Sequence, residues 1–231
     1  MAQEIADIGV RVSAVSTVEA AANALRELIL DGRLLPGARL REHEYAERLG
    51  IARHSFRAAT QILIGEGLLK REPHRGVEVP VLSAGDVADI FRLRTALEIE
   101  AVRLVGEAGI VPAAAQLAVD EMSSLAEDAP RRAIVWPDRR FHQAIIEATG
   151  SVRMQRAYFG LQSEITLCLA QLEPACDKPG QVAAEHEELL APIISGDTDL
   201  AEKLFSHHLD QAVISLVSLH SARSEEGATE A

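Results

Sequence analysis

A mainly α-helical chain made of two domains is predicted by three features of the sequence. Ala, Leu, Val and Ile dominate the 48% of residues that are hydrophobic, while only 3% are aromatic, which favours helices packed through aliphatic side chains. Proline and glycine divide the second part of the chain into stretches with helical spacing of apolar residues. The first part has the order helix, turn, two short helices and hairpin. We therefore expect an N-terminal winged helix-turn-helix (α with a two-stranded wing) followed by an all-α bundle of six or so helices.

The domain boundary is expected near residues 81–84, where the pattern of apolar residues changes. The expected parts are a flexible arm over 1–16, the winged domain over 17–82, the helical domain over 83–221 and a disordered tail over 222–231. Little room is left between the two domains for a flexible linker.

The winged domain is expected to begin with a helix that Thr17 caps and Gly32 ends. Pro36-Gly37 marks a turn, after which short helices are expected in EHEYAERLG and HSFRAATQILIGEG. Two strands, about 68–72 and 76–81, flank a polar turn and would form the wing.

The helical domain is expected to open with a long amphipathic helix capped by Ser83. Its apolar stripe includes Val87 and Ile90 and continues through either Leu93 or Arg94 at three- to four-residue spacing. The helices expected after it cover about 112–128, 131–148, 152–172, 180–195 and 198–221.

The net charge of the whole chain, −12, argues at first against a nucleic-acid partner. Its distribution changes that conclusion, because residues 1–82 hold 11 basic and 11 acidic residues, whereas residues 83–231 hold 12 and 24. Residues 33–76 alone hold nine basic residues against five acidic ones. A basic module on an acidic body is a suitable arrangement for DNA binding by one end of a protein.

Two arginines stand on the first turns of the second short helix. Arg53 and Arg57 are four residues apart and therefore share a face, and arginine reads the O6 and N7 atoms of guanine in the major groove. Arg75 and Gly76 lie at the tip of the hairpin, where a cation and a flexible backbone suit a wing. The alternative is an ordinary solvated basic face, but the order of elements and the local basic excess favour DNA binding.

Four residues of the helical domain form a candidate metal site. Asp138 and His142 are one helical turn apart, and His186 and His208 lie on later helices. Three imidazoles and one carboxylate suit a borderline divalent ion such as Zn²⁺, Ni²⁺ or Mn²⁺. The alternative is that each is an ordinary surface or core residue, and His207 is a second choice for the last position.

Residues 17–82 resemble the DNA-binding domain of the GntR family. The shared landmarks include Pro36-Gly37, Leu40, Leu49-Gly50, Arg53, Arg57, Glu66-Gly67-Leu68 and Arg75-Gly76. The resemblance implies that Arg53 and Arg57 make most contacts with double-stranded DNA. It gives secondary roles to His43, His54, Ser55, Arg75 and Gly76.

The recognition helix departs from the family pattern at several positions. Ala52 replaces a family Ser or Thr, His54-Ser55 replaces Thr-Pro, and Ala58 replaces Glu. These departures imply an operator sequence that differs from those of relatives.

Residues 86–220 resemble the FCD effector domain of the FadR-type GntR subfamily, beginning at DVADIFRLRTALEIEAVRL. The resemblance implies a homodimer, and a metal held by Asp-x-x-x-His and two later histidines. It favours His208 over His207 and zinc as the first choice of metal. It also implies a small carboxylate effector beside the metal, with Arg94 and then Arg139 as its binding arginines. The alternative for Arg94 is a structural salt bridge with Glu98, four residues later.

These features predict a regulator rather than an enzyme: a repressor of a catabolic operon, bound as a dimer to a palindromic operator and released by a small organic acid. The alternatives are a metal-dependent enzyme that uses the Asp/His₃ site, or a regulator with a purely structural metal.

A cytoplasmic location is also expected. The two cysteines, Cys168 and Cys176, are too few for a disulfide framework and suit reduced thiols. The N-terminus lacks the pattern of a signal peptide, and no apolar run is long enough to suggest a membrane partner.

Overall fold

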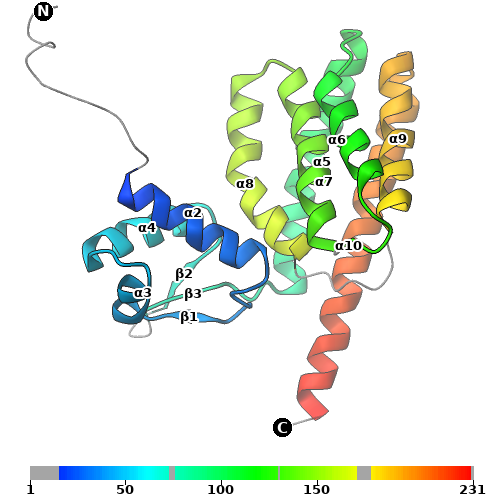
Figure 1. Cartoon of the computed structure of the whole chain (residues 1–231). Helices are drawn as coiled ribbons and strands as arrows, with labels where there is room; N and C mark the ends of the chain where they lie inside the picture. Colours follow the sequence, from blue (N-terminus) through cyan, green and yellow to red (C-terminus); the bar gives the residue numbers. More distant parts are fainter. Residues whose placement is uncertain (1–15, 73–75, 130, 171–177, 230–231) are drawn as a thin grey trace, which may run out of the picture.

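The computed structural model describes residues 16–72, 76–129, 131–170 and 178–229. A small head of helices and one sheet stands beside a bundle of longer helices (Figure 1). The expected fold class, mainly α with a winged helix-turn-helix and an all-α domain, is therefore confirmed. Within the described residues, no helix is both long and apolar enough to cross a membrane.

In the described part of the head lie three helices and a three-stranded antiparallel sheet of order β1-β3-β2. These elements are α2 (Thr17–Leu30), β1 (Arg39–Leu40), α3 (Glu42–Arg48), α4 (Arg53–Gly65), β2 (Lys70–Glu72) and β3 (Gly76–Glu78). β1 adds a strand to the expected two-stranded wing, pairing Arg39 with Glu78 and Leu40 with Val77. The expected helix cap is wrong by one residue. The Ser16 side chain accepts from the Glu19 backbone and Glu19 bonds back, so Ser16 rather than Thr17 caps α2.

The helices of the head are held together by a compact apolar core. Leu25 and Ile29 of α2 pack in the same buried cluster as Phe56 and Leu63 of α4. Each such side chain contributes about 1.5–3 kcal/mol when it is fully buried. This packing fixes α4 by one face and leaves its opposite face to solvent.

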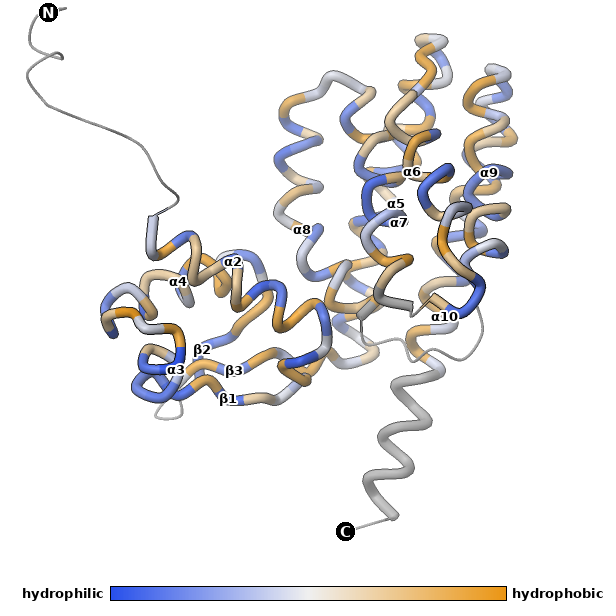
Figure 2. Tube along the Cα trace, viewed as in Figure 1, coloured by the Kyte–Doolittle hydropathy of each residue, from blue (hydrophilic) through white to orange (hydrophobic). Residues whose placement is uncertain are grey.

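The described residues of the bundle form six helices. They are α5 (Ala84–Glu107), α6 (Ala113–Ser124), α7 (Arg131–Ala148), α8 (Val152–Ala170), α9 (Pro179–Ser195) and α10 (Thr198–Thr229). Ser83 caps α5 as expected, in a reciprocal pair with Asp86. Hydrophobic residues recur along the coloured parts of the bundle helices (Figure 2). The stripe of α5 that faces inward passes through Arg94, while Leu93 is 49% exposed.

The last helix is longer than the sequence analysis predicts. α10 continues to Thr229 and extends beyond the bundle (Figure 1), so residues 222–229, expected as part of a disordered tail, are helical. Alanine, arginine and glutamate in this polar segment are good helix formers, and no proline interrupts them. The expected arm, apart from Ser16, lies outside the described residues.

The head meets the bundle at the end of α4. Gly67 has φ +73°, and a Cβ atom built there would lie 2.5 Å from Cγ of Glu164 on α8. The preceding residue, Glu66, accepts hydrogen bonds of 2.8 and 2.6 Å from Arg26 of α2. The C-terminal end of α4 is thus held both within the head and against the bundle.

We expect Gly67→Ala to destabilise the protein more than Gly50→Ala does. Both glycines have positive φ, +73° and +64°, so each substitution costs about 1–2 kcal/mol for a left-handed alanine. Only Gly67 faces a neighbour, because nothing lies within 4 Å of the Cβ position at Gly50. Urea unfolding of both variants measures the difference, and adding Glu164→Ala to Gly67→Ala is expected to recover part of it. Equal losses at the two glycines would contradict this close contact.

Candidate DNA-binding surface and metal centre

The N-terminal half of α4 presents two arginines to solvent. Arg53 begins the helix, and Arg57, one turn later, has 63% of its side chain exposed. Arg53 Nη2 lies 3.3 Å from Nδ1 of His43 on α3, and Arg57 Nε lies 3.4 Å from a Glu42 carboxylate oxygen. His54 is exposed beside them. The structure therefore brings together Arg53, Arg57 and His43 at the junction of α3 and α4.

The three other expected DNA-contacting positions, Ser55, Gly76 and Arg75, differ in their outcomes. Ser55 is only 8% exposed and lies on the buried face of α4 with Phe56, so the structure removes it from the face of Arg53 and Arg57. Helical phase explains this, because Ser55 stands two residues, or about 200°, away from each arginine. Gly76 is exposed at the start of β3 with φ +87°, which suits its expected place in the wing. Arg75 lies outside the described residues.

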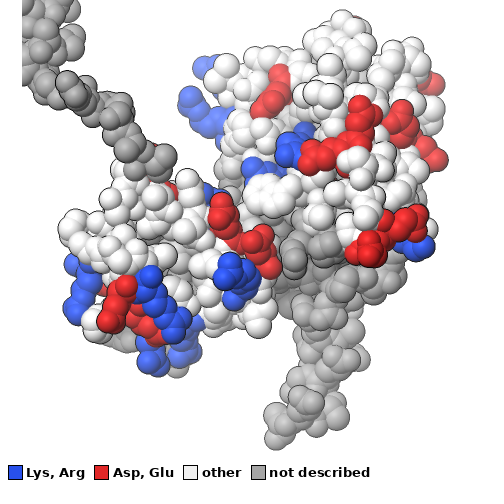
Figure 3. Space-filling model, in the orientation of Figure 1, with Lys and Arg blue, Asp and Glu red and all other residues white. Residues whose placement is uncertain are grey.

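Basic side chains gather on the head over α3 and α4, with acidic side chains between them (Figure 3). The exposed arginines of the head are Arg33, Arg39, Arg41, Arg48, Arg53, Arg57 and Arg71. Some have acidic partners, such as Arg48 with Glu44 at 2.9 Å. Exposed pairs of this kind contribute little to stability, so a phosphate can replace the carboxylate at small cost.

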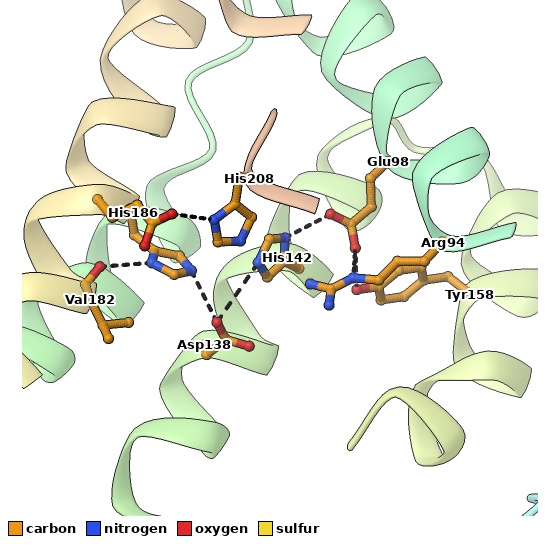
Figure 4. Close-up of polar contacts among 9 residues, drawn as sticks. Arg94, Glu98, Asp138, His142, Tyr158, Val182, His186 and His208 are labelled. Atoms are coloured by element: carbon orange, nitrogen blue, oxygen red, sulfur yellow. Dashed lines mark hydrogen bonds and ion pairs between the residues drawn. The ribbon is translucent and has the colours of Figure 1, made fainter. Parts of the chain in front are cut away.

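Three histidines from three helices converge inside the bundle (Figure 4). His142 is on α7, His186 on α9 and His208 on α10, and one ligating nitrogen of each lies within 4.8 Å of those of the others. His142 and His186 are buried, and the His208 side chain is 13% exposed. The neighbouring His207 is exposed.

The same nitrogen of each imidazole already has a hydrogen-bond partner. Nδ1 of His142 donates to Glu98 at 2.7 Å, Nδ1 of His186 to the Val182 carbonyl at 2.8 Å, and Nδ1 of His208 to Glu185 at 2.8 Å. These bonds leave Nε2 of each ring as the nitrogen whose lone pair can bind an ion. Histidines that bind metals are commonly supported in this way.

Asp138 completes the group from the turn of α7 before His142. Its Oδ1 lies 3.1 Å from His186 Nε2 and 3.9 Å from His142 Nε2. Among the described residues, Asp138 Oδ2 and the Nε2 atoms of His142 and His186 are buried and have no hydrogen-bond partner. Buried polar atoms left in this state are costly, and a divalent ion bound between them would satisfy all three.

The charges of the site follow from its burial. Burial lowers the pKa of His142 to about 4 despite the nearby Glu98 carboxylate, so the ring is neutral at pH 7. Burial alone would raise the pKa of Asp138, but His186, His142 and Arg94 together hold it well below its usual range. Phe141 packs edge-on against the rings of His142 and His186. A neutral imidazole and an ionised carboxylate in an apolar surrounding are the forms that bind a metal.

A buried polar network, of which the sequence analysis foresaw only the Arg94–Glu98 pair, adjoins the site. Arg94 Nε donates to Glu98 Oε1 at 2.7 Å, and the Tyr158 hydroxyl donates to the same oxygen at 2.8 Å. The salt bridge proposed as the alternative for Arg94 therefore exists. The Nη atoms of Arg94 point toward the side of Asp138 and His142 (Figure 4). Only the Arg94-x-x-x-Glu98 spacing signalled any of this in the sequence.

Arg139 occupies a different position. It is half-buried beside Asp138, and its guanidinium carbon lies 4.7 Å from the centroid of the Trp136 ring. Its Nε is buried and has no hydrogen-bond partner among the residues that the structure describes.

The two glutamates on either side of His186 in the sequence, Glu185 and Glu187, both accept hydrogen bonds. Glu185 accepts the hydrogen bond of His208, and Glu187 accepts one of 3.2 Å from Gln116 of α6. Each therefore already has a hydrogen-bonding role, and Glu187 is exposed.

Comparison with known proteins gives two family matches. Residues 17–79 match the family described as "Bacterial regulatory proteins, gntR family", and residues 89–211 match the FCD domain. A Paenarthrobacter nicotinovorans protein described as "Probable D-xylose utilization operon transcriptional repressor" is 32% identical over 183 residues, which are 78% of this chain and 80% of that protein. The Paraburkholderia xenovorans (strain LB400) regulator BphR is 28% identical over 86% of this chain and 84% of its own.

Solved structures agree with these matches. A GntR transcriptional regulator from Rhodococcus sp. RHA1 has a TM-score of 0.76 at 27% identity, covering 88% of this chain and 99% of that chain. McbR/YncC of E. coli shares the fold, with a TM-score of 0.73 at 24% identity over 90% of this chain and 100% of its own.

Proposed function

The chain belongs to the GntR family of bacterial regulatory proteins and has an FCD domain behind its head; from this premise we propose that it represses a catabolic operon until a small carboxylate binds beside a divalent metal in the bundle. It is a DNA-binding transcription regulator. The relative described as the repressor of a D-xylose utilization operon supports repression of a catabolic operon. We place the protein in the cytoplasm, as a homodimer.

The DNA half of the proposal rests on α4. Arg53 and Arg57 are its proposed base-reading side chains, supported by His43 and His54, with Gly76 on the wing; Arg75 is a further candidate from the sequence. Two heads of a dimer would bind a palindromic operator, whose half-site spacing the dimer geometry sets.

The metal half of the proposal is carried by one observation: Nδ1 of each of the three histidines is hydrogen-bonded, so Nε2 is the nitrogen that each ring can offer to an ion. Asp138, His142, His186 and His208 would hold the ion, with Zn²⁺ the first choice and Ni²⁺ or Mn²⁺ possible for the same donors. When bound, the ion supplies positive charge that offsets the desolvation of an anionic effector.

The arginines beside the site would complete the effector pocket. Arg94 is buried, and within the described chain only its Nε makes a hydrogen bond, so its Nη atoms can bind a carboxylate. Arg139, with its unpartnered Nε, is the second candidate. Because Arg94 pairs with Glu98 through Nε and keeps both Nη nitrogens as donors, it can serve both as a structural and as a binding residue.

The test is release of operator DNA by small mono- and dicarboxylates, measured on the protein with Zn²⁺ and after chelation. We expect at least one acid to release DNA only from the metal-loaded protein, while the chelated protein still binds DNA. Equal release of DNA by an acid with Zn²⁺ and after chelation would contradict the effector part of the proposal. A mildly purified protein without stoichiometric divalent ion would contradict the metal part.

The same samples distinguish the two alternatives. If the metal raises the unfolding temperature but no acid acts through it, the ion is structural. If an acid is consumed, and the consumption needs added metal and is lost in His142→Ala, the protein is an enzyme. The bonded states of Glu185 and Glu187 favour the regulator over the enzyme, because a catalytic metal also needs a placed acid or base.

A further inference from the structure

The buried carboxylate of Glu98 joins two parts of the bundle. Its side chain is 0% exposed, with Oε1 bound to Arg94 and Tyr158 and Oε2 bound to Nδ1 of His142. The three partners lie on α5, α8 and α7. All other groups that touch a ring nitrogen of the three histidines come from α7 and α9, within the described residues.

The position of α5 in the chain makes this contact important. α5 begins at Ala84, only six residues after β3 ends at Glu78, so it is the helix that follows directly from the head. His142 is the one proposed ligand that bonds to α5. A change at the metal site can therefore reach this helix through a single short hydrogen bond.

We propose that Glu98 is a positioning residue that orients His142 for the metal and transmits the effect of metal binding to α5. This inference rests on the proposed function. The ionised carboxylate holds the imidazole with Nε2 toward the other ligands and makes that nitrogen a stronger donor. In return, a metal on Nε2 makes Nδ1–H a stronger donor to Glu98, which tightens the link to α5.

The chain offers matched controls. Glu185 supports His208 through an equivalent hydrogen bond of 2.8 Å, but its side chain is 52% exposed, so water can replace it. Tyr158 bonds to the same carboxylate as His142 does but carries no charge. Glu185→Gln therefore weakens one supporting hydrogen bond and Tyr158→Phe removes one, and both leave the buried charge of Glu98 in place.

The experiment measures Zn²⁺ affinity by competition with a chromogenic chelator, and the visible spectrum of the Co²⁺ protein. We expect Glu98→Gln to weaken Zn²⁺ binding about 10- to 100-fold and to alter the Co²⁺ spectrum. Glu185→Gln and Tyr158→Phe are expected to stay within about threefold of the natural protein, because solvent or the remaining bonds compensate. Glu98→Gln with unchanged affinity and spectrum would overturn the positioning role.

Hydrogen exchange of the backbone amides tests the link to α5. Adding Zn²⁺ is expected to slow exchange in residues 84–107 of the natural protein. In Glu98→Gln saturated with Zn²⁺, exchange should still slow in α7 and α9 but not in α5. Equal protection of α5 in both proteins would overturn the transmission.

A folding defect does not remove the test. Glu98→Gln leaves Arg94 buried without its partner, so Arg94→Met/Glu98→Gln, which removes both charges, serves as the second variant. The same loss of Zn²⁺ affinity is expected there, and unchanged affinity would count against the inference. If the natural protein itself binds no Zn²⁺, the proposed function fails instead.

Discussion

Alanine in place of Arg57 is expected to abolish sequence-specific operator binding while the head stays folded. The loss is about 1–3 kcal/mol for each head, the discrimination that one bidentate arginine–guanine pair provides. Stability should hardly change, because within the described residues this exposed side chain pairs only with Glu42, at 3.4 Å, and exposed pairs contribute about 0–1 kcal/mol. The measurement compares affinity for a duplex that the natural protein selects from random DNA with affinity for unrelated duplexes.

Arg48→Ala is the matched control. Arg48 is equally exposed, at 68%, and has a carboxylate partner, but it stands in the last turn of α3 rather than at the start of α4. Its loss removes the same charge and should weaken selected and unrelated duplexes alike. If Arg57→Ala behaves like Arg48→Ala, α4 does not read bases through Arg57.

His208→Ala is expected to remove the divalent ion, whereas His207→Ala keeps it. One substitution deletes a proposed ligand and the other an exposed neighbour on the same helix. Loss of a ligand should weaken Zn²⁺ binding by more than the roughly 10–100-fold that supporting residues typically give. Metal content after mild purification and chelator competition check the result.

Stability gives an independent measure of the same site. An ion present at about 100 times its dissociation constant stabilises the folded state by about 2.7 kcal/mol. Chelation should therefore lower the free energy of unfolding of the natural protein and of His207→Ala, but not that of His208→Ala. Loss of metal from His207→Ala with retention in His208→Ala would reverse the assignment of the two histidines.

The helices were predictable because proline, glycine and the cap Ser83 mark their ends. The predicted helices over 131–148 and 198–221 begin where α7 and α10 do, and Ser83 caps α5. β1 was not predictable, since a two-residue strand has no periodicity and exists only through its pairing with β3. Whether Ser55 is buried depends on how α4 is rotated about its axis relative to the core, and its exposed sequence neighbours do not indicate that rotation.

The site was predictable as a set of residue types but not as a network. Asp138 and His142 share one turn of one helix, so their proximity follows from local geometry. The bonds from Glu98 to His142 and to Tyr158 join positions 44 and 60 residues apart, which only the packing of α5, α7 and α8 brings together. Burial of a charged stripe on α5 also runs against hydrophobic patterning, which is why Leu93 looked as suitable as Arg94.

The supports of the three imidazoles differ in how mutation can reach them. Val182 contributes its main-chain oxygen, so any residue that keeps α9 helical at that position leaves His186 in place. Glu98 and Glu185 act through side chains, which single codon changes can alter. The support of His186 therefore tolerates side-chain substitution, whereas the supports of His142 and His208 depend on which side chain is present. Descendants of this chain can therefore change in metal affinity without changing a ligand.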